Sequence, residues 1–465
     1  MLVFAMAVSK YVILILMLFY TLDSILSFFK RKNKNGIYIR QELYIFMIQF
    51  VAFGTLCLRT GEAEYLFYYA FAQILLFSMI NLSQIIYPMI DREISNHMAM
   101  LMGTGFIILS RLNFEKAVKQ LIIAAVATGF SLFIPFIIRH FSILKHLKWI
   151  YAAAGILMLS VVLVLGKVTY GSKISYTVAG FTVQPSEFVK IVFIFCMAAL
   201  LCRHKCFLTF LISAVIAAAH VMILVLSRDL GTALLFFVTY MAMLLVASKN
   251  YLYLFLGLGA GGGASVLAYH LFRHVQVRVQ AFKDPFSVID KEGYQITQSL
   301  FAIGNGGIFG TGLMKGVPED IPFVESDFIF SAIAEEFGLV ISVCILLICL
   351  FSFLRFMKLA MQLKDSFYRL VTVGIAVMYL FQVFLTVGGG MKFIPLTGVT
   401  LPFISYGGSS ILVSIVLFFI VQGVCLVLDD ERMEEQDEEE QADEYLQDDD
   451  EYDEEMEEED YEEEE

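Results

Sequence analysis

Pairs of charged side chains stand at the edges of long apolar segments in this sequence. Glu187 and Lys190 are three residues apart at the start of one segment, so on a helix they share one face. Arg228 and Asp229 precede another segment. Charged groups at such depth in a membrane face a protein interior or a wet cavity. There, cations can bind an anionic group and carboxylates can orient them. The simpler alternatives are a structural ion pair for Glu187 and Lys190, and helix capping by Asp229.

A polar stretch from Arg278 to Glu336 lies between two apolar segments and carries carboxylates, aromatic residues and glycine-rich turns. Loops between membrane helices are usually short, so a loop of this size is a place for chemistry or for partner binding. A second irregular stretch, residues 393–410, contains prolines and glycines that prevent a regular helix. Irregular backbone near a bilayer is tolerated only against protein or water. We therefore expect both stretches, with Arg111, to line one outward-facing polar cavity.

The elements that must position these groups are membrane helices. The 465 residues are 59% hydrophobic and have a mean hydropathy of +0.76, far above the balance of a soluble protein. Apolar runs of membrane-spanning length recur along the chain. Thirteen spans are predicted, at residues 11–29, 42–60, 65–90, 97–111, 118–139, 147–166, 186–202, 206–226, 230–247, 251–272, 328–355, 367–388 and 407–428. The sequence therefore predicts an all-α polytopic integral membrane protein.

Charge is divided unevenly along the chain. The net charge is −13, yet residues 429–465 hold 26 of the 45 acidic residues, and the remainder has a surplus of 12 positive charges. Lys and Arg cluster in four short loops that the positive-inside rule places in the cytoplasm, at residues 30–34, 139–148, 202–205 and 355–369. The N-terminus and the loop 273–327 are then outside, and the acidic tail is cytoplasmic. An acidic run repels itself and cannot bury a core, so we expect a disordered tail, available to a basic cytoplasmic partner.

These segments resemble the SEDS family of polytopic membrane proteins, which includes FtsW, RodA and SpoVE. The resemblance covers roughly residues 97–428. Seven sequence elements occur in the family's order: Q-P-S-E-F-V-K at 184–190, D-L-G-T at 229–232, R-V-Q-A-F-K-D-P at 278–285, G-Y-Q-I-T-Q-S-L-F-A-I-G at 293–304, G-G-I-F-G-T-G-L at 306–313, D-F-I-F-S-A-I-A-E-E at 327–336, and I-P-L-T-G…L-P-F-I-S-Y-G-G-S-S at 394–410. Each element alone is a weak signal, whereas seven in order are a strong one.

The resemblance implies a ten-helix core that polymerises lipid II into glycan strands at the outer face of a bacterial cytoplasmic membrane. It also implies a class B penicillin-binding protein as partner, and a role in cell division, cell shape or sporulation. Residues 1–96 then form an extension of about three transmembrane helices, and residues 97–428 form the core with the long extracellular loop 273–327. Residues 429–465 form the acidic disordered tail.

The family's essential Asp lies six residues before the Tyr of the G-Y-Q element, and that position is Val288 here. Asp290, two positions later, is the expected catalytic base, and Asp284 is the runner-up. A carboxylate at this place would accept the proton of the attacking sugar hydroxyl. The other residues expected to bind or position substrate are Arg111, Glu187, Lys190, Asp229, Arg278, Tyr294, Gln298 and Ser405.

The sequence gives less direct evidence for a cofactor and for partners. Glu187 and Asp229 are candidates to help bind a divalent cation such as Mg²⁺, although no motif identifies a metal. Membrane lipids are expected partners, and nucleic acid is not. Two other functions stay open: a lipid II transporter, which a polar cavity between helices would also suit, and a non-catalytic scaffold of a cell-wall synthesis complex, which Val288 permits.

Overall fold

The structure, a computed structural model, describes residues 2–30, 34–165, 167–169, 172–178, 181–203, 206–289 and 293–462. Its helices are α1 (Leu2–Phe29), α2 (Asn35–Thr60), α3 (Glu64–Ile86), α4 (Arg92–Leu112), α5 (Phe114–Ser131), α6 (Ile134–His140), α7 (Lys148–Leu165), α8 (Pro185–Leu201), α9 (Phe207–Leu226), α10 (Leu230–Ser248), α11 (Tyr251–Leu271), α12 (Arg273–Lys283), α13 (Tyr294–Gly306), α14 (Ile329–Gln362), α15 (Ser366–Gly390) and α16 (Gly408–Glu462). Its strands are β1 (Lys167–Thr169), β2 (Ser172–Val178) and β3 (Phe181–Val183).

The prediction of an all-α polytopic membrane protein is confirmed. Within the described residues, ten helices are long and apolar enough to cross a membrane, and three of them, α1 to α3, precede residue 92. The three remaining predicted spans coincide with α4, α7 and α8, which are shorter or more polar. The span predicted at 118–139 is divided into α5 and α6. Pro135 explains this break, because proline has no amide hydrogen and clashes with the carbonyl of residue 131.

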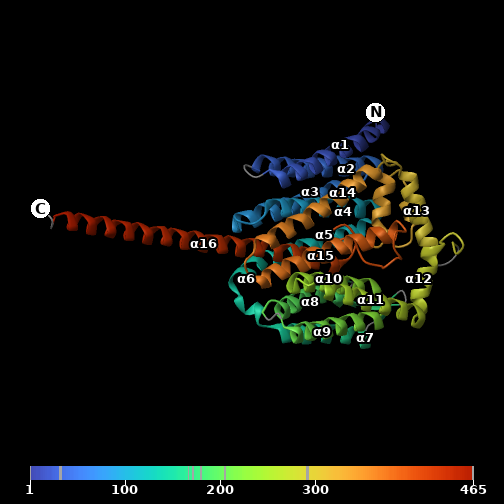
Figure 1. The fold of residues 1–465 in the computed structure, drawn as a ribbon. Helices are drawn as coiled ribbons and strands as arrows, with labels where there is room; N and C mark the ends of the chain where they lie inside the picture. Colours follow the sequence, from blue (N-terminus) through green and yellow to red (C-terminus); the bar gives the residue numbers. More distant parts are fainter. Residues whose placement is uncertain are drawn as a thin grey trace.

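The long helices run side by side, and the two ends of the bundle differ (Figure 1). Helices α12 and α13 lie across one end, which we call the loop end, and the N-terminus is also at this end. Helix α16 leaves the bundle at the opposite end, which we call the tail end. In the structure α16 continues to Glu462, which differs from the disordered tail that the sequence predicts from Asp429. The continuation extends a membrane helix through residues such as Glu, Gln and Met, which favour helix.

The sequence also predicts no strands, whereas residues 167–183 contain three. Strand β2 pairs antiparallel with β1 on one side and with β3 on the other. This small sheet connects α7 to α8 and leaves the helical architecture unchanged.

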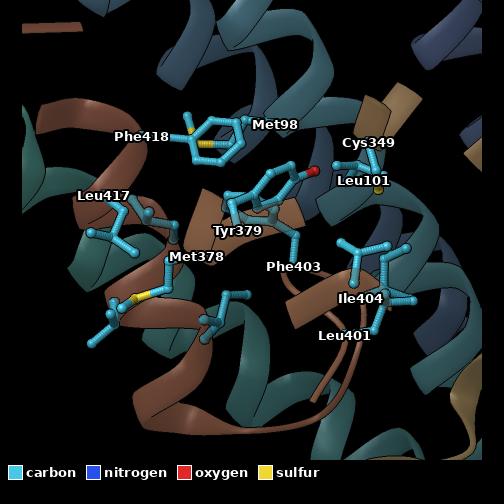
Figure 2. Packing of buried hydrophobic residues seen from close by; sticks show 14 of the residues in the cluster. Met98, Leu101, Cys349, Met378, Tyr379, Leu401, Phe403, Ile404, Leu417 and Phe418 are labelled. Carbon is cyan, nitrogen blue, oxygen red and sulfur yellow. The ribbon is translucent and has the colours of Figure 1, made fainter. Parts of the chain in front are cut away.

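A buried apolar core joins α4, α14, α15 and α16 to the irregular segment 391–407, which lies between α15 and α16 (Figure 2). The ring of Phe403 in this segment lies 4.7 Å from that of Phe418 in α16. A Cβ at Gly105 of α4 would lie 2.7 Å from the carbonyl oxygen of Phe403, so the helix and the segment approach at backbone distance. The irregular segment is thus packed against protein, as the bilayer requires.

Candidate active site at the loop end

The glycine-rich stretch 306–312 is fixed to a break in α14. Gly338 adopts φ 84° and ψ 176°, which interrupts the helix. The amide of Leu339 therefore donates to the carbonyl of Gly307 at 3.0 Å instead of to its own helix. A Cβ at Gly338 would lie 2.2 Å from the nitrogen of Gly310, so this backbone contact requires glycine. The break makes the first turns of α14 part of the loop end.

Arg111, at the end of α4, is held by two carboxylates from this region. Its Nε donates to Glu336 Oε1 at 2.9 Å, and its Nη1 donates to Glu319. Its Nη2 donates to the carbonyl of Gly316 at 3.2 Å. Although burial acts to raise it, the hydrogen bond from Arg111 lowers the pKa of Glu319. Each of the three guanidinium nitrogens already has a partner, so Arg111 positions the loop rather than offering a free phosphate ligand.

Asp229 caps α10, as its place in the sequence suggests, and does more. Its Oδ1 accepts from the amide of Thr232 at 3.2 Å. Its Oδ2 accepts from Gln184 Nε2 at 3.3 Å and from Ser186 Oγ at 3.2 Å. The carboxylate thereby links the start of α10 to the start of α8, so capping alone does not describe its role.

Glu187 and Lys190 form the buried ion pair that their spacing predicts. Lys190 Nζ lies 2.7 Å from Glu187 Oε1 and donates to Gln382 Oε1 at 2.9 Å. The Lys190 side chain is only 1% exposed. Gln382 Nε2 in turn donates to the carbonyl of Thr400 at 2.9 Å, so the pair anchors the irregular segment to α8 and α15.

Arg278, in the middle of α12, is the cation with the clearest link to the irregular segment 391–407. Its Nη1 donates to the carbonyl of Thr397 at 3.2 Å. Burial lowers the pKa of Arg278, and the charges of Asp229 and Asp327 oppose that change. Burial raises the pKa of the half-buried Asp327 to about 6, although a hydrogen bond from Ser326 and the charge of Arg278 act to lower it. The charges of two carboxylates from separate elements thus favour the protonated form of this one cation.

Ser405 belongs to a set of hydrogen bonds that shape the segment 391–407. Its Oγ donates to the carbonyl of Ser326 at 2.5 Å and accepts from the amide of Leu401 at 2.9 Å. Its carbonyl accepts from Gln120 Nε2 at 2.9 Å. This residue therefore positions the backbone next to Asp327.

Tyr294 and Gln298 lie on α13, one turn apart. Tyr294 is exposed and Gln298 is half-buried, so both can meet a ligand at the loop end. Helix α13 is anchored by Ser299, whose Oγ donates to the carbonyl of Gly390 at 2.7 Å and lies 2.6 Å from Ser331 Oγ.

The two candidate bases flank the position of Val288. Asp284 is exposed and accepts from the amide of Ser287 at 3.3 Å. The carbonyl of Val288 accepts from the amide of Gly293 at 3.0 Å, which closes the turn before α13. Asp290 lies outside the described residues.

Glu187 and Asp229 do not fit a metal site in this geometry. Oxygens of both already accept from protein donors, as given above. No group of three or more His, Cys, Asp or Glu residues in the described part of the chain is placed to hold a metal ion.

Three residues at the loop end were not singled out from the sequence. Asp327 and Glu336 belong to the D-F-I-F-S-A-I-A-E-E element, which supports the family resemblance but does not indicate what either carboxylate does. Gln382 is a single polar residue within an apolar span, a pattern that marks an interior contact but not its partner.

Comparisons with known proteins agree with this arrangement. The "Cell cycle protein" family, which comprises FtsW, RodA and SpoVE, has a model that matches residues 94–427. The chain is 32% identical over 369 residues to the peptidoglycan glycosyltransferase RodA of Mycobacterium tuberculosis H37Rv, covering 72% of this chain and 78% of that protein. It is 30% identical to the probable peptidoglycan glycosyltransferase FtsW of Bacillus subtilis, covering 62% of this chain and 76% of that one.

Two solved structures are similar as well. A chain from a peptidoglycan synthase complex has a TM-score of 0.63 and 26% identity, covering 73% of this chain and 98% of its own. RodA of Thermus thermophilus shares the fold, with a TM-score of 0.54 and 24% identity over 72% of this chain and 96% of its own.

Proposed function

Because this chain belongs to the FtsW, RodA and SpoVE family, we propose that it is a peptidoglycan glycosyltransferase that polymerises lipid II. The observation that carries the proposal is the position of Arg278, a half-buried cation on α12 whose Nη1 donates to the carbonyl of Thr397 in the irregular segment. Helix α12, which carries it, leads directly into the loop that contains Asp284 and Asp290. A cation beside a carboxylate-bearing loop is what transfer from a pyrophosphate donor needs.

In the reaction, a hydroxyl oxygen of the acceptor sugar bonds to the anomeric carbon of the donor as the bond from that carbon to the polyprenyl pyrophosphate breaks. The hydroxyl proton passes to a carboxylate, which as general base contributes about 10²–10⁴-fold. A single displacement inverts the anomeric centre. We assign the base to Asp290, with Asp284 as the second candidate.

Charge grows on the leaving pyrophosphate as that bond breaks, so a fixed cation is needed there. Arg278 is the candidate for this contact, since it lies on α12, directly before the carboxylate-bearing loop, and its Nη1 donates to the carbonyl of Thr397. Lys190 is enclosed and Arg111 is engaged by Glu319 and Glu336, so we assign both to positioning. Tyr294 and Gln298 on α13 are candidates to contact the sugar moieties.

We further propose that the loop end faces outward, with the N-terminus outside and the tail in the cytoplasm. The basic loops near residues 139–148 and 355–369 lie toward the tail end, which favours this orientation. A class B penicillin-binding protein is the proposed partner. The similar chain of a peptidoglycan synthase complex supports this assignment.

The test uses the full chain with its class B penicillin-binding protein and fluorescently labelled lipid II. We expect glycan polymer from the wild type and none from Asp290→Ala. The matched control is Asp320→Ala, which removes an exposed carboxylate of the same loop and should leave the polymer unchanged. Loss of polymer in Asp284→Ala with full activity in Asp290→Ala would transfer the role of base to Asp284.

Absence of polymer from every form would contradict the proposed activity. In that case, movement of labelled lipid II across liposomes containing the protein would favour a transporter. Absence of both activities, with retained binding to the partner, would favour a scaffold.

A further inference from the structure

A polar cavity of about 500 Å³ opens at the tail end, between the N-terminal helices and the core. Its walls come from the start of α2, the connection between α3 and α4, the end of α14, and α16. Four basic side chains line it, namely those of Arg92, Arg355, Lys358 and Arg432. It lies at the opposite end of the bundle from the candidate active site, so that site does not account for it.

Two of the four cations are neutralised by carboxylates. Arg92 Nη2 lies 2.8 Å from Glu42 Oε1. Arg355 lies 2.7 Å from Asp91 Oδ2 and 3.1 Å from Glu93 Oε2. These pairs build the wall of the cavity and are not available to a ligand.

The other two cations are exposed and are not neutralised in this way. Lys358 lies over the ring of Phe28 at 5.7 Å, and Arg432 donates to Gln362 Oε1 at 3.1 Å. Neither forms a salt bridge with a carboxylate of the described residues, although Asp429 also lines the cavity.

Lys34 directly precedes Asn35, which lines the cavity, and the charges of two lining residues act on its side chain. Its pKa is lowered by burial and by the charges of Arg355 and Lys358, while Glu93 and Asp91 act to raise it. In the described part of the chain Lys34 also has no salt bridge. Lys34, Lys358 and Arg432 thus form no salt bridge within the described residues, and Asp429 is the one carboxylate of the cavity lining, among those residues, that is not in a salt bridge.

Apolar side chains continue from the cavity onto the lipid-facing surface. Met89 lines the cavity and is 55% exposed, and Ile85 and Ile86 nearby are exposed as well. An anionic group with attached acyl chains would satisfy both surfaces at once, whereas a soluble anion would satisfy only the cations. Basic pockets between membrane helices on the cytoplasmic side are suited to lipid head groups.

We propose that this cavity binds the phosphate of an anionic phospholipid from the leaflet at the tail end, with Lys358, Arg432 and Lys34 as its cationic ligands. The lipid would contact α2 and α3 together with α14 and α16, and so would join the extension to the core. Residues before 94 lie outside the family match, so the site depends on elements that are additional to the family core.

The test measures lipid retention by the full chain. Protein is reconstituted in vesicles of equal dioleoylphosphatidylglycerol and dioleoylphosphatidylcholine, extracted in mild detergent and examined by native mass spectrometry. We expect bound phosphatidylglycerol on the wild type. The variant Lys358→Gln with Arg432→Gln should retain it less, by roughly fivefold for each charge removed.

The matched control is Lys148→Gln with Lys364→Gln, which removes two basic residues from the same end without touching the cavity. It should retain phosphatidylglycerol as the wild type does. Equal loss in both double variants, or equal retention in both, would overturn the proposal.

A parallel arm adds inorganic phosphate to lipid-free protein and follows thermal unfolding. No stabilisation by phosphate, with selective retention of phosphatidylglycerol, supports a lipid ligand. Stabilisation of the wild type but not of the cavity variant, without lipid retention, would overturn the lipid assignment in favour of a soluble phosphate compound.

Discussion

Helices α4 and α14 are joined near each end by a cluster of one arginine and two carboxylates. The helix that supplies the arginine at one end contributes no arginine to the cluster at the other end. At the loop end, α4 supplies Arg111, and α14 with its preceding loop supplies Glu336 and Glu319. At the tail end, α14 supplies Arg355, and the acids Asp91 and Glu93 belong to the first turn of α4 and its cap.

The two clusters differ in their access to water. Glu319 is 49% exposed, so one arm of the loop-end cluster can be exchanged for solvent. At the tail end Glu93 is fully buried, and Ser27 of α1 donates to it. His97 lies between Ser24 and Ser352, at 3.2 Å from each hydroxyl.

Because of this difference, the loop-end cluster can exchange a partner for water more easily than the tail-end cluster. A loop that binds and releases a substrate benefits from a partner that water can replace. The tail-end cluster instead joins α1 of the extension to α4 and α14 through Arg355 and the fully buried Glu93, whose charge depends on its protein partners. The extension also reaches the loop end, where Lys10 Nζ donates to the carbonyl of Gly310 at 2.5 Å.

The largest effect is expected from Arg355→Ala. This change leaves Asp91 and the buried Glu93 without their cation, and the loss of one partner from a buried ion pair costs about 3–5 kcal/mol. We expect a lower midpoint of thermal unfolding in detergent and a poor yield of folded protein. Lys364→Ala, at an exposed residue of the same end, should leave the midpoint unchanged. A midpoint equal to that of the wild type in both variants would show that the tail-end cluster does not stabilise the fold.

A smaller effect on stability is expected from Arg111→Ala. Because Glu319 is half in solvent, only Glu336 is left buried and unpaired, and we expect a cost of about 1–3 kcal/mol. We expect the polymerisation rate of the folded protein to fall as well, because the segment 307–336 loses its attachment to α4. Thermal unfolding and initial polymerisation rates on the same preparation separate the two quantities. Equal loss of stability in Arg111→Ala and Arg355→Ala would remove the distinction between the ends.

The pH dependence of polymerisation tests the loop end without removing any contact. The charge of ionised Asp327 acts on Arg278, and the pKa of Asp327 is about 6, so we expect the rate to fall as the pH drops below 6. The variant Asp327→Asn should lack this inflection while its rate at neutral pH is lowered.

Loss of folding does not explain such a fall through this residue. The pKa of Asp327 is raised by folding, so between the pKa of the unfolded chain and about 6 the folded state binds the proton more tightly. Lowering the pH through this window therefore favours folding at this group. An inflection that persists in Asp327→Asn would assign it to another residue.

The sequence predicts the helices well because hydrophobic length is a local property. All thirteen predicted spans fall on helices, although several are too short: those at 11–29, 42–60 and 97–111 begin well after the first residues of α1, α2 and α4. Helix α4 begins at Arg92, because Asp91 caps it and its charged first turn is neutralised by distant residues. A hydropathy profile counts those charges as polar and cannot see their partners.

Local contacts of the site could be predicted from the sequence, whereas contacts between residues far apart in the chain could not. The ion pair of Glu187 and Lys190 follows from helical spacing, and the structure contains it. The contacts of Arg111 with Glu319 and Glu336 join residues more than 200 positions apart, which no local pattern reveals. The functional weight of Asp284 and Asp290 stays a prediction, because it depends on a loop conformation that spacing does not fix.

The smallest effect is expected where an arginine and a carboxylate meet in water. Arg139 binds Asp430 of α16 through two hydrogen bonds, at 2.9 and 2.6 Å, a geometry as good as that of either internal cluster. Its side chain is 39% exposed and that of Asp430 is 35% exposed, so solvent screens the pair. We expect Arg139→Ala to cost less than about 1 kcal/mol, and the cost should vanish in high salt. Thermal unfolding at two salt concentrations measures this. A cost near that of Arg355→Ala would mean that bond geometry rather than burial sets the strength of these clusters.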